Sequence, residues 1–134
     1  MPSRSLLPLF VPALALAVAA LDPAAAAEPV TTAAPLPPKE AGARYGQALG
    51  ASLVCPNARL APAAEALMAR YGGADLDAFK ETAQRVTLVW KKTLGCDARA
   101  DINRCRLLNE ISCGEALREI GPAGSQLPGL IDPK

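Results

Sequence analysis

The clearest hydrophobic pattern of the chain lies between Asp75 and Gly95. Six apolar residues follow one another there at gaps of three or four positions: Leu76, Phe79, Ala83, Val86, Trp90 and Leu94. This spacing places them on one face of an amphipathic helix. Asp75 is a suitable N-cap residue, and a glycine after the last apolar position is typical of a helix end. Leu88 falls on the polar side of this helix, either as an ordinary exposed leucine or as part of a partner surface.

Two further helices are predicted before this stripe. In residues 40–54, apolar residues at helical spacing accompany glycines at every fourth position: Gly42, Gly46 and Gly50. Such a row lets a second helix approach closely, so we expect this helix to pack tightly on a neighbour and to end at Pro56. A shorter helix is expected over Pro62–Tyr71, closed by the glycine pair at 72–73.

The fourth predicted helix, residues 101–120, is apolar on more than one side. A broad face holds five of its residues: Ile102, Cys105, Cys113, Ala116 and Ile120. Leu107 and Ile111 point elsewhere, and a helix that is apolar on several sides tends to be buried on several sides. We therefore expect this helix to lie centrally, with Asn109 as a buried polar group that needs partners. A capping box beginning at Ser112 leaves open whether the helix breaks there.

Both flanks of these helices are expected to be irregular. Residues 28–39 are rich in proline and alanine and predict an extended, disordered lead-in. The tail, residues 122–134, is rich in glycine and proline, and it either packs back over the helices or frays. No segment alternates clearly enough for a sheet. The predicted fold is all-α, a small four-helix, disulfide-stapled bundle over residues 40–121 with an extended N-terminal lead-in and an irregular C-terminal tail.

Residues 1–27 have the order of a secretory signal peptide. One basic residue, Arg4, precedes an apolar run over residues 6–21, and four alanines follow. We expect cleavage between Ala27 and Glu28, with cuts after residue 20 or 26 as alternatives. A membrane anchor is the less favoured interpretation, because two prolines interrupt the run and a spanning helix needs about 20 apolar residues. After cleavage we expect no stable membrane insertion and a location in the periplasm or outside the cell.

All four cysteines follow the expected cleavage site: Cys55, Cys96, Cys105 and Cys113. An even number in a small exported domain indicates disulfide bonds, and the chain lacks both histidine and the close cysteine pairs of zinc sites. Cys105 and Cys113 on one helix would lie about 12 Å apart, too far for a bridge. We favour Cys96–Cys105 with Cys55–Cys113, over the alternative of Cys55–Cys105 with Cys96–Cys113.

The amino-acid composition argues against several classes of function. Without histidine, the chain lacks the commonest general base and the commonest metal ligand. It has no phosphate-binding glycine loop, and a net charge of +1 gives no case for nucleic acid. We therefore expect a non-catalytic module without cofactor or metal.

The expected function is to bind an unidentified protein partner or to serve the cell envelope. Leu88, Arg104 and Arg106 form the candidate interaction surface, and these two arginines could join Arg59 and Arg99 in a basic patch for an anion. One alternative is a carrier of a small apolar ligand between helices, near Trp90 and Tyr45. Another is a hydrolase that uses two carboxylates as acid and base.

Overall fold

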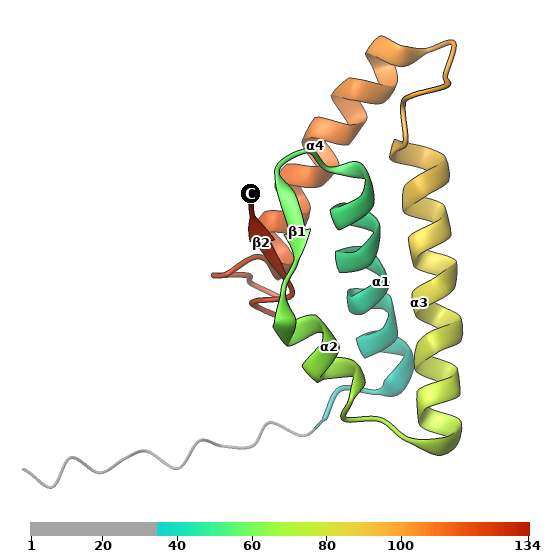
Figure 1. Cartoon of the computed structure of the whole chain (residues 1–134), viewed down its shortest axis with the longest axis vertical. Coiled ribbons are helices and arrows are strands. Elements are labelled where there is room, and N and C mark those ends of the chain that lie inside the picture. Colours follow the sequence, from blue (N-terminus) through green and yellow to red (C-terminus); the bar gives the residue numbers. More distant parts are fainter. Residues whose placement is uncertain (1–34) are drawn as a thin grey trace, which may run out of the picture. The chain divides into compact units, whose positions relative to one another are not determined.

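A computed structural model describes residues 35–134 of the chain. The predicted signal peptide, its cleavage site at Ala27 and Glu28, and much of the predicted lead-in lie outside these residues. The elements follow in the order α1 (Pro38–Val54), β1 (Ala58–Leu60), α2 (Pro62–Met68), α3 (Gly73–Leu94), α4 (Ile102–Ile120) and β2 (Ile131–Pro133) (Figure 1). The predicted helical bundle is confirmed. Within the described range, no helix combines the length and the apolar character that a membrane crossing requires.

The helix α1 lies at the centre of the bundle. It packs against α2, α3, α4 and β1, and most extensively against α3. A Cβ atom added at Gly46 would stand 2.5 Å from the carbonyl oxygen of Ala83, and one added at Gly50 would stand 2.5 Å from the Cβ of Trp90. Real Cβ atoms do not approach so closely, so the glycine row is the close helix contact that its spacing predicts.

The expectation that α4 lies centrally is wrong. One face of α4, which includes Cys113 and Ile120, is buried. The opposite side is open to solvent, because Leu107 is 58%, Leu108 42% and Ile111 50% exposed. The small residues of α1 admit neighbours on several sides, so α1 takes the central place and α4 lies at an edge (Figure 1). The helix α4 is unbroken across its whole length, including the position of the capping box.

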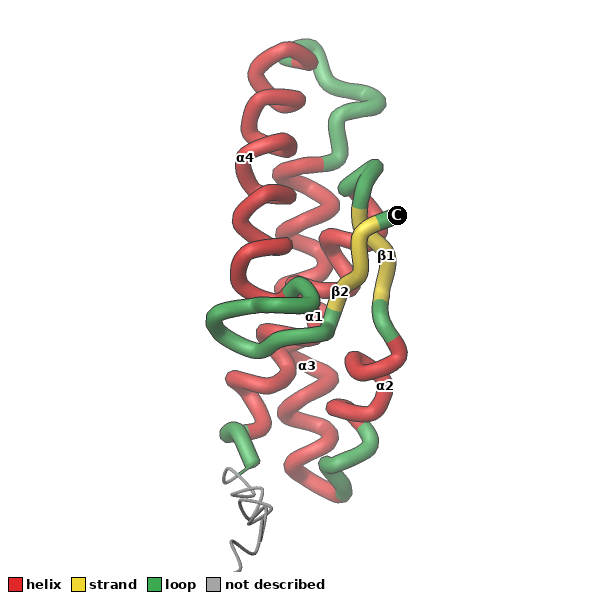
Figure 2. The backbone as a smooth tube through the Cα atoms, turned by 90° about the vertical axis from the view of Figure 1, so that its left-hand side faces the viewer, coloured by secondary structure: helices red, strands yellow, loops and turns green. Residues whose placement is uncertain are grey.

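The expectation of no sheet is wrong in one place. The strands β1 and β2 pair antiparallel, with Ala58 opposite Pro133 and Leu60 opposite Ile131 (Figure 2). The tail is therefore packed rather than frayed, and Leu130 and Ile131 are buried in the core. Each strand has three residues, too few for an alternating pattern to stand out in the sequence.

Helix boundaries differ from the predicted ones by a few residues. The helix α1 begins at Pro38, so the end of the predicted lead-in is already helical; proline suits the first turn because it has no N–H to leave unbonded. The helix α3 begins at Gly73, which places Asp75 inside the first turn instead of at the N-cap. The helix α2 ends at Met68, short of Tyr71.

Two disulfides connect the helices. Cys55, just after α1, is joined to Cys113 in α4 with a Cα–Cα distance of 5.8 Å. Cys96, just after α3, is joined to Cys105 in the first turns of α4 with a Cα–Cα distance of 5.7 Å. The structure thus has the favoured pairing rather than the alternative one. The first bridge fixes α4 to the central helix, and the second closes the connection between α3 and α4.

Candidate functional site

An open groove of about 390 Å³ runs along one side of the α1–α3 pair. Its apolar lining comes from α1, α2 and α3: Tyr45, Leu49, Leu53, Met68, Phe79 and Leu88. The charged residues of the lining are Lys80 and Lys91, both on α3. We call this feature the α1–α3 groove.

The local sequence explains why a groove forms here. The glycine face of α1 meets α3 at close range, so the larger residues beside it project along the flank of the contact. Tyr45, Leu49 and Leu53 follow one another at four-residue spacing and make the α1 wall, because residues four apart lie on the same side of a helix. On α3, the residues at 80, 84, 88 and 91 make the opposite wall by the same rule.

Aromatic rings hold one end of the α1–α3 groove in place. Phe79 is fully buried. Its ring centroid lies 5.4 Å from that of Tyr45 and 5.3 Å from that of Tyr71, within the range of favourable aromatic pairs. The hydroxyl of Tyr71 donates a hydrogen bond of 2.7 Å to the carbonyl oxygen of Leu36. The residues that precede α1 are therefore tied to the segment between α2 and α3.

A second hollow, of about 470 Å³, adjoins the groove at the other end and shares Leu53 and Lys91 with it. Asn109 lies in this hollow and satisfies the ends of two helices. Its amide nitrogen donates to the carbonyl oxygens of Val54 at 2.9 Å and Leu94 at 3.0 Å. These are the last residues of α1 and α3, whose carbonyls have no partner within the helix. Asn109 is half-buried rather than fully buried, and it has the hydrogen-bond partners expected for a polar group at this position.

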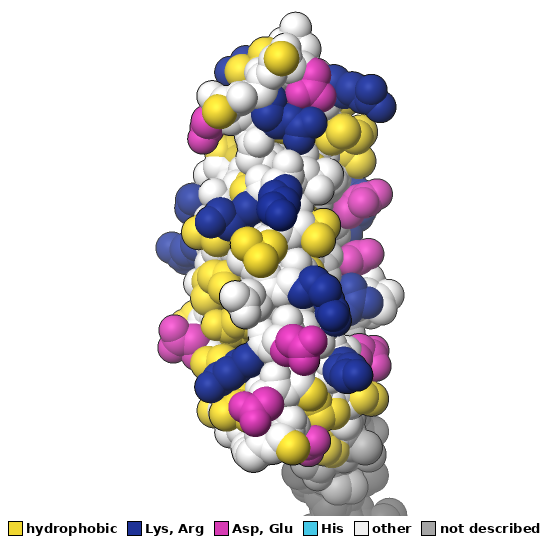
Figure 3. Space-filling view, turned by 90° about the vertical axis from the view of Figure 1, so that its right-hand side faces the viewer, with side chains coloured by type: hydrophobic (Ala, Val, Ile, Leu, Met, Phe, Trp, Pro, Cys, Tyr) yellow, Lys and Arg dark blue, Asp and Glu magenta, His cyan; other side chains and the backbone are white. Residues whose placement is uncertain are grey.

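The three predicted interaction residues, Leu88, Arg104 and Arg106, do not lie together on one surface. Leu88 lines the α1–α3 groove and is 45% exposed, and Arg106 lines the adjoining hollow. Arg104 belongs to the lining of neither. Figure 3, which looks at the molecule from the side of α3, shows Lys and Arg side chains among hydrophobic ones. Leu53, which is 57% exposed, and both lysines were not singled out from the sequence.

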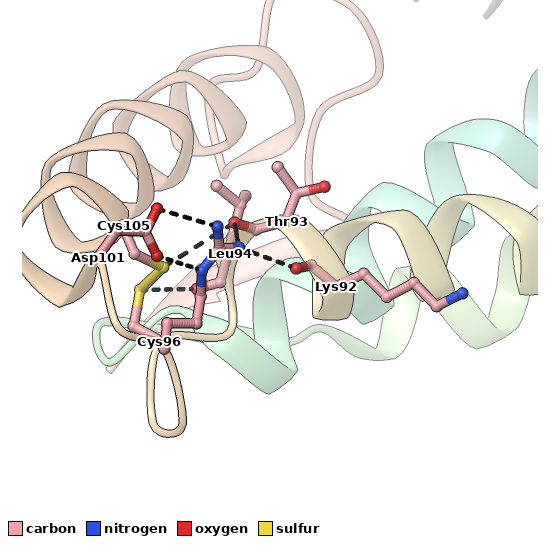
Figure 4. A network of polar contacts seen from close by, with 7 residues as sticks. Lys92, Thr93, Leu94, Cys96, Asp101 and Cys105 are labelled. Carbon is pink, nitrogen blue, oxygen red and sulfur yellow. Dashed lines mark hydrogen bonds and ion pairs between the residues drawn. A yellow bond between two sulfur atoms is a disulfide. The ribbon is translucent and has the colours of Figure 1, made fainter.

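Arg99 has a structural role instead of joining an anion-binding patch. Its guanidinium donates to both carboxylate oxygens of Asp101, at 2.9 and 3.1 Å, and to the carbonyl oxygens of Lys92 and Thr93, each at 3.2 Å (Figure 4). These hydrogen bonds lower the pKa of the Asp101 carboxyl and raise the pKa of Arg99. The i,i+3 spacing of Asp101 and Arg104 would also allow a pair between them, but the structure pairs Asp101 with Arg99. Arg99 caps α3 beside the Cys96–Cys105 bridge.

Two carboxylates, Glu115 and Glu119, share a hollow, and each has an arginine nearby. Glu115 and Glu119 line a hollow beside the C-terminal segment. An oxygen of Glu119 accepts hydrogen bonds from Arg44 at 3.3 Å and from Gln47 at 2.8 Å, and these contacts tie α1 to α4. Glu115 lies 4.0 Å from Arg118, three residues further along α4, and both side chains are exposed. Each carboxylate therefore has a cation beside it, and Glu119 alone of the two connects α4 to α1.

Trp90 and Tyr45, near which a small apolar ligand was predicted to bind, do not line a common pocket. Tyr45 lines the α1–α3 groove, but Trp90 does not, and the Trp90 side chain packs against Gly50. Over residues 35–134, no group of three or more histidine, cysteine, aspartate or glutamate residues is arranged to hold a metal ion.

No protein-family model, curated protein or solved structure matches this chain.

Proposed function

We propose that this protein is an exported, non-catalytic binding module that holds an amphipathic segment of a partner protein in the α1–α3 groove. The observation that carries the proposal is the groove itself, which presents apolar side chains from three helices and leaves Leu53 and Leu88 about half exposed. An amphipathic helix laid into an apolar groove is a recurring mode of peptide recognition.

The open shape favours a protein segment over a small molecule. Sites for small ligands enclose most of the ligand surface, whereas this groove leaves its leucines open to solvent. Lys80 and Lys91 lie about three turns apart on α3, or roughly 16 Å along its axis. That length fits about three turns of a partner helix, which would place apolar residues against Leu49, Leu53 and Leu88.

The charges that line the groove indicate the sign of the charge on the partner segment. Lys80 and Lys91 are the charged residues of the groove, and Arg106 adds a third cation in the adjoining hollow, where Asp97 is the one acid of the lining. Carboxylates on the partner segment would complement these cations and speed its association. We therefore infer an acidic amphipathic segment.

Export rests on two independent features. Residues 1–27 have the charge and hydropathy order of a signal peptide. The described residues hold two disulfides and leave no cysteine free, and such bonds persist mainly in oxidising compartments. An enzyme is disfavoured because all four thiols are in bridges and the chain has no histidine.

Site-specific photo-crosslinking in the exporting cell tests the proposal. A photoreactive residue at Leu88 is expected to capture one defined protein, and the same residue at Val89 is the control. Val89 is a neighbouring aliphatic residue on α3, 56% exposed, that does not line the groove. With that protein purified, Leu53→Glu should raise the Kd by about tenfold or more, as loss of an interface anchor does.

The outcomes separate the two candidate functions. A crosslinked small molecule, identified by mass spectrometry, would support the apolar-ligand carrier instead. Equal capture from Leu88 and Val89, or an unchanged Kd for Leu53→Glu, would contradict the groove as the binding site. Circular dichroism of Leu53→Glu checks that the variant is folded, as we expect for a change at a half-exposed position.

A further inference from the structure

The outward side of α4 carries a regular seam that the bundle does not use. Six residues follow one another at gaps that alternate between three and four: Asp101, Arg104, Leu108, Ile111, Glu115 and Arg118. Residues at this spacing lie along one side of a helix; here the two central ones are apolar and the four outer ones are charged. Leu107 borders the seam, and Asp101 directly precedes α4. We call these seven residues the outer face of α4.

The outer face of α4 is apolar at its centre and open to solvent. Leu107 is 58%, Leu108 42% and Ile111 50% exposed, and they account for half of the large hydrophobic residues that the described chain exposes. Three such side chains within about one turn of helix form a patch rather than scattered single residues. The opposite side of α4 already holds its contacts with α1 and the Cys55–Cys113 bridge.

The charges at the two ends of the seam are self-complementary. Read from its N-terminal end, the seam is acidic, basic, apolar, apolar, acidic, basic. If a second α4 lies antiparallel with Leu108 opposite Ile111, then Arg104 faces Glu115 of the other copy. The same register places Asp101 opposite Arg118 of the other copy. A parallel arrangement would instead place each charge opposite itself.

We propose that the outer face of α4 binds the same face of a second copy of this chain, antiparallel and with two-fold symmetry. In a two-fold interface each contact occurs twice, so the register gives two Arg104–Glu115 pairs and two Asp101–Arg118 pairs around four central apolar side chains. Glu115 and Arg118 are free to turn toward the second copy, because their side chains are 58% and 73% exposed and lie 4.0 Å apart. Asp101 keeps its hydrogen bonds to Arg99, and its carboxylate, which is 48% exposed, still presents negative charge to Arg118 of the other copy. The proposal is independent of the α1–α3 groove, whose lining does not include α4.

The strength of the dimer follows from the size of the seam. The distance from Asp101 to Arg118 is about 25 Å along the helix axis, so two such faces bury less surface than the roughly 1,600 Å² of a standard stable interface. We therefore expect a dimer with a Kd in the micromolar range. Sedimentation equilibrium of the purified, disulfide-bonded protein over a concentration series measures it directly.

Charge exchange tests the register. Arg104→Glu places like charges opposite each other twice per dimer and should raise the Kd by about tenfold or more, because like charges across an interface oppose association. Glu115→Arg should have the same effect. An equimolar mixture of the two single variants should recover dimers, because both of these contacts between the two variants then join a glutamate to an arginine. Arg85→Glu, on the exposed side of α3, is the control for the change in net charge.

Each outcome decides one part of the proposal. A wild-type chain that remains monomeric up to about 1 mM, a weak limit for specific association, would overturn it. A dimer that Arg104→Glu and Arg85→Glu weaken equally would place the interface elsewhere. Loss of dimers in both single variants without recovery in the mixture would overturn the antiparallel register. Arg104→Glu is expected to remain folded, since acidic residues are favourable in the first turn of a helix.

Discussion

Gly46 of α1 lies directly against the backbone of Ala83 in α3. A Cβ at Gly46 would stand 2.5 Å from the carbonyl oxygen of Ala83 and 2.9 Å from the Cβ of Val86. The hydroxyl oxygen of Thr87 lies 2.8 Å from the Ala83 carbonyl oxygen and 3.2 Å from the Gly46 carbonyl oxygen. The two helix backbones are thus in direct contact through a position that has no side chain, and this contact fixes the width of the α1–α3 groove.

Gly46→Ala is expected to lower the free energy of unfolding by about 1–3 kcal/mol, because an added methyl group forces the packed backbones apart. This direction is opposite to the helix propensity of the two residues, which favours alanine. Urea denaturation measures the change. The control is Gly114→Ala, inside α4, where the nearest heavy atom to an added Cβ lies 3.9 Å away. The higher helix propensity of alanine should leave this variant as stable as the wild type or up to about 1 kcal/mol more stable. Equal stabilities of both variants would contradict the close contact.

Asn109→Asp should lower the free energy of unfolding by about 1–3 kcal/mol, because it removes two hydrogen bonds that are each worth about 0.5–1.5 kcal/mol. The change keeps the shape of the side chain but removes the amide that donates to the carbonyl oxygens of Val54 and Leu94. Asn103→Asp, at an exposed position of α4, is the matched control and should leave the stability nearly unchanged. If the two variants unfold at the same urea concentration, Asn109 does not hold the helix ends.

The two disulfides are expected to contribute unequally. Replacing both Cys55 and Cys113 by alanine removes a disulfide between residues 58 positions apart in the sequence. The same change at Cys96 and Cys105 removes a disulfide between residues 9 positions apart. The chain-entropy relation gives losses of about 4 and about 3 kcal/mol, respectively. Differential scanning calorimetry of the two double variants compares them. A larger loss for the Cys96–Cys105 pair would show that loop entropy does not dominate.

The ion pair of Arg99 and Asp101 predicts a pH dependence. Hydrogen bonds from Arg99 lower the pKa of the Asp101 carboxyl in the folded protein. The contribution of this ion pair to the free energy of unfolding is therefore present above the pKa of about 4 that Asp101 has in the unfolded chain. It is lost as the pH falls through the lower pKa of the folded state. The stability advantage of the wild type over Asp101→Asn should therefore shrink below about pH 4. Denaturation at several pH values measures it, and NMR titration should show a higher pKa for Asp101 in Arg99→Gln. A constant advantage down to acidic pH would contradict this assignment.

The candidate binding site could be predicted only in part. The position of Leu88 on the polar side of a clear amphipathic helix singled it out, and it lines the groove. Tyr45, Leu49 and Leu53 recur at four-residue spacing in the sequence. Nothing in that spacing distinguishes a row that fills the core from one that forms the wall of an open groove. Arg104 and Arg106 are two residues apart on one helix, so they point in different directions, and only Arg106 reaches the hollow.

By itself, the sequence determined the local features of this protein. The stripe of α3, the glycine row of α1 and the exclusion of a Cys105–Cys113 bridge all follow from the spacing of residues along a helix, which backbone geometry fixes. Helix spacing left two disulfide pairings open, and the structure has the one that joins Cys96 to Cys105 across the short connection between two helices.

Only the tertiary structure decided which helix is central and what the tail does. The hydrophobic pattern favoured α4 as the central helix, but the small residues of α1 let α3 approach closely and left Leu107 and Ile111 exposed. The strands β1 and β2 join segments far apart in the chain, and neither is long enough to have a pattern of its own. Which helix becomes central, and where the tail packs, depends on how segments far apart in the chain compete for the same buried surface. The spacing of residues within one segment does not reveal the outcome of that competition.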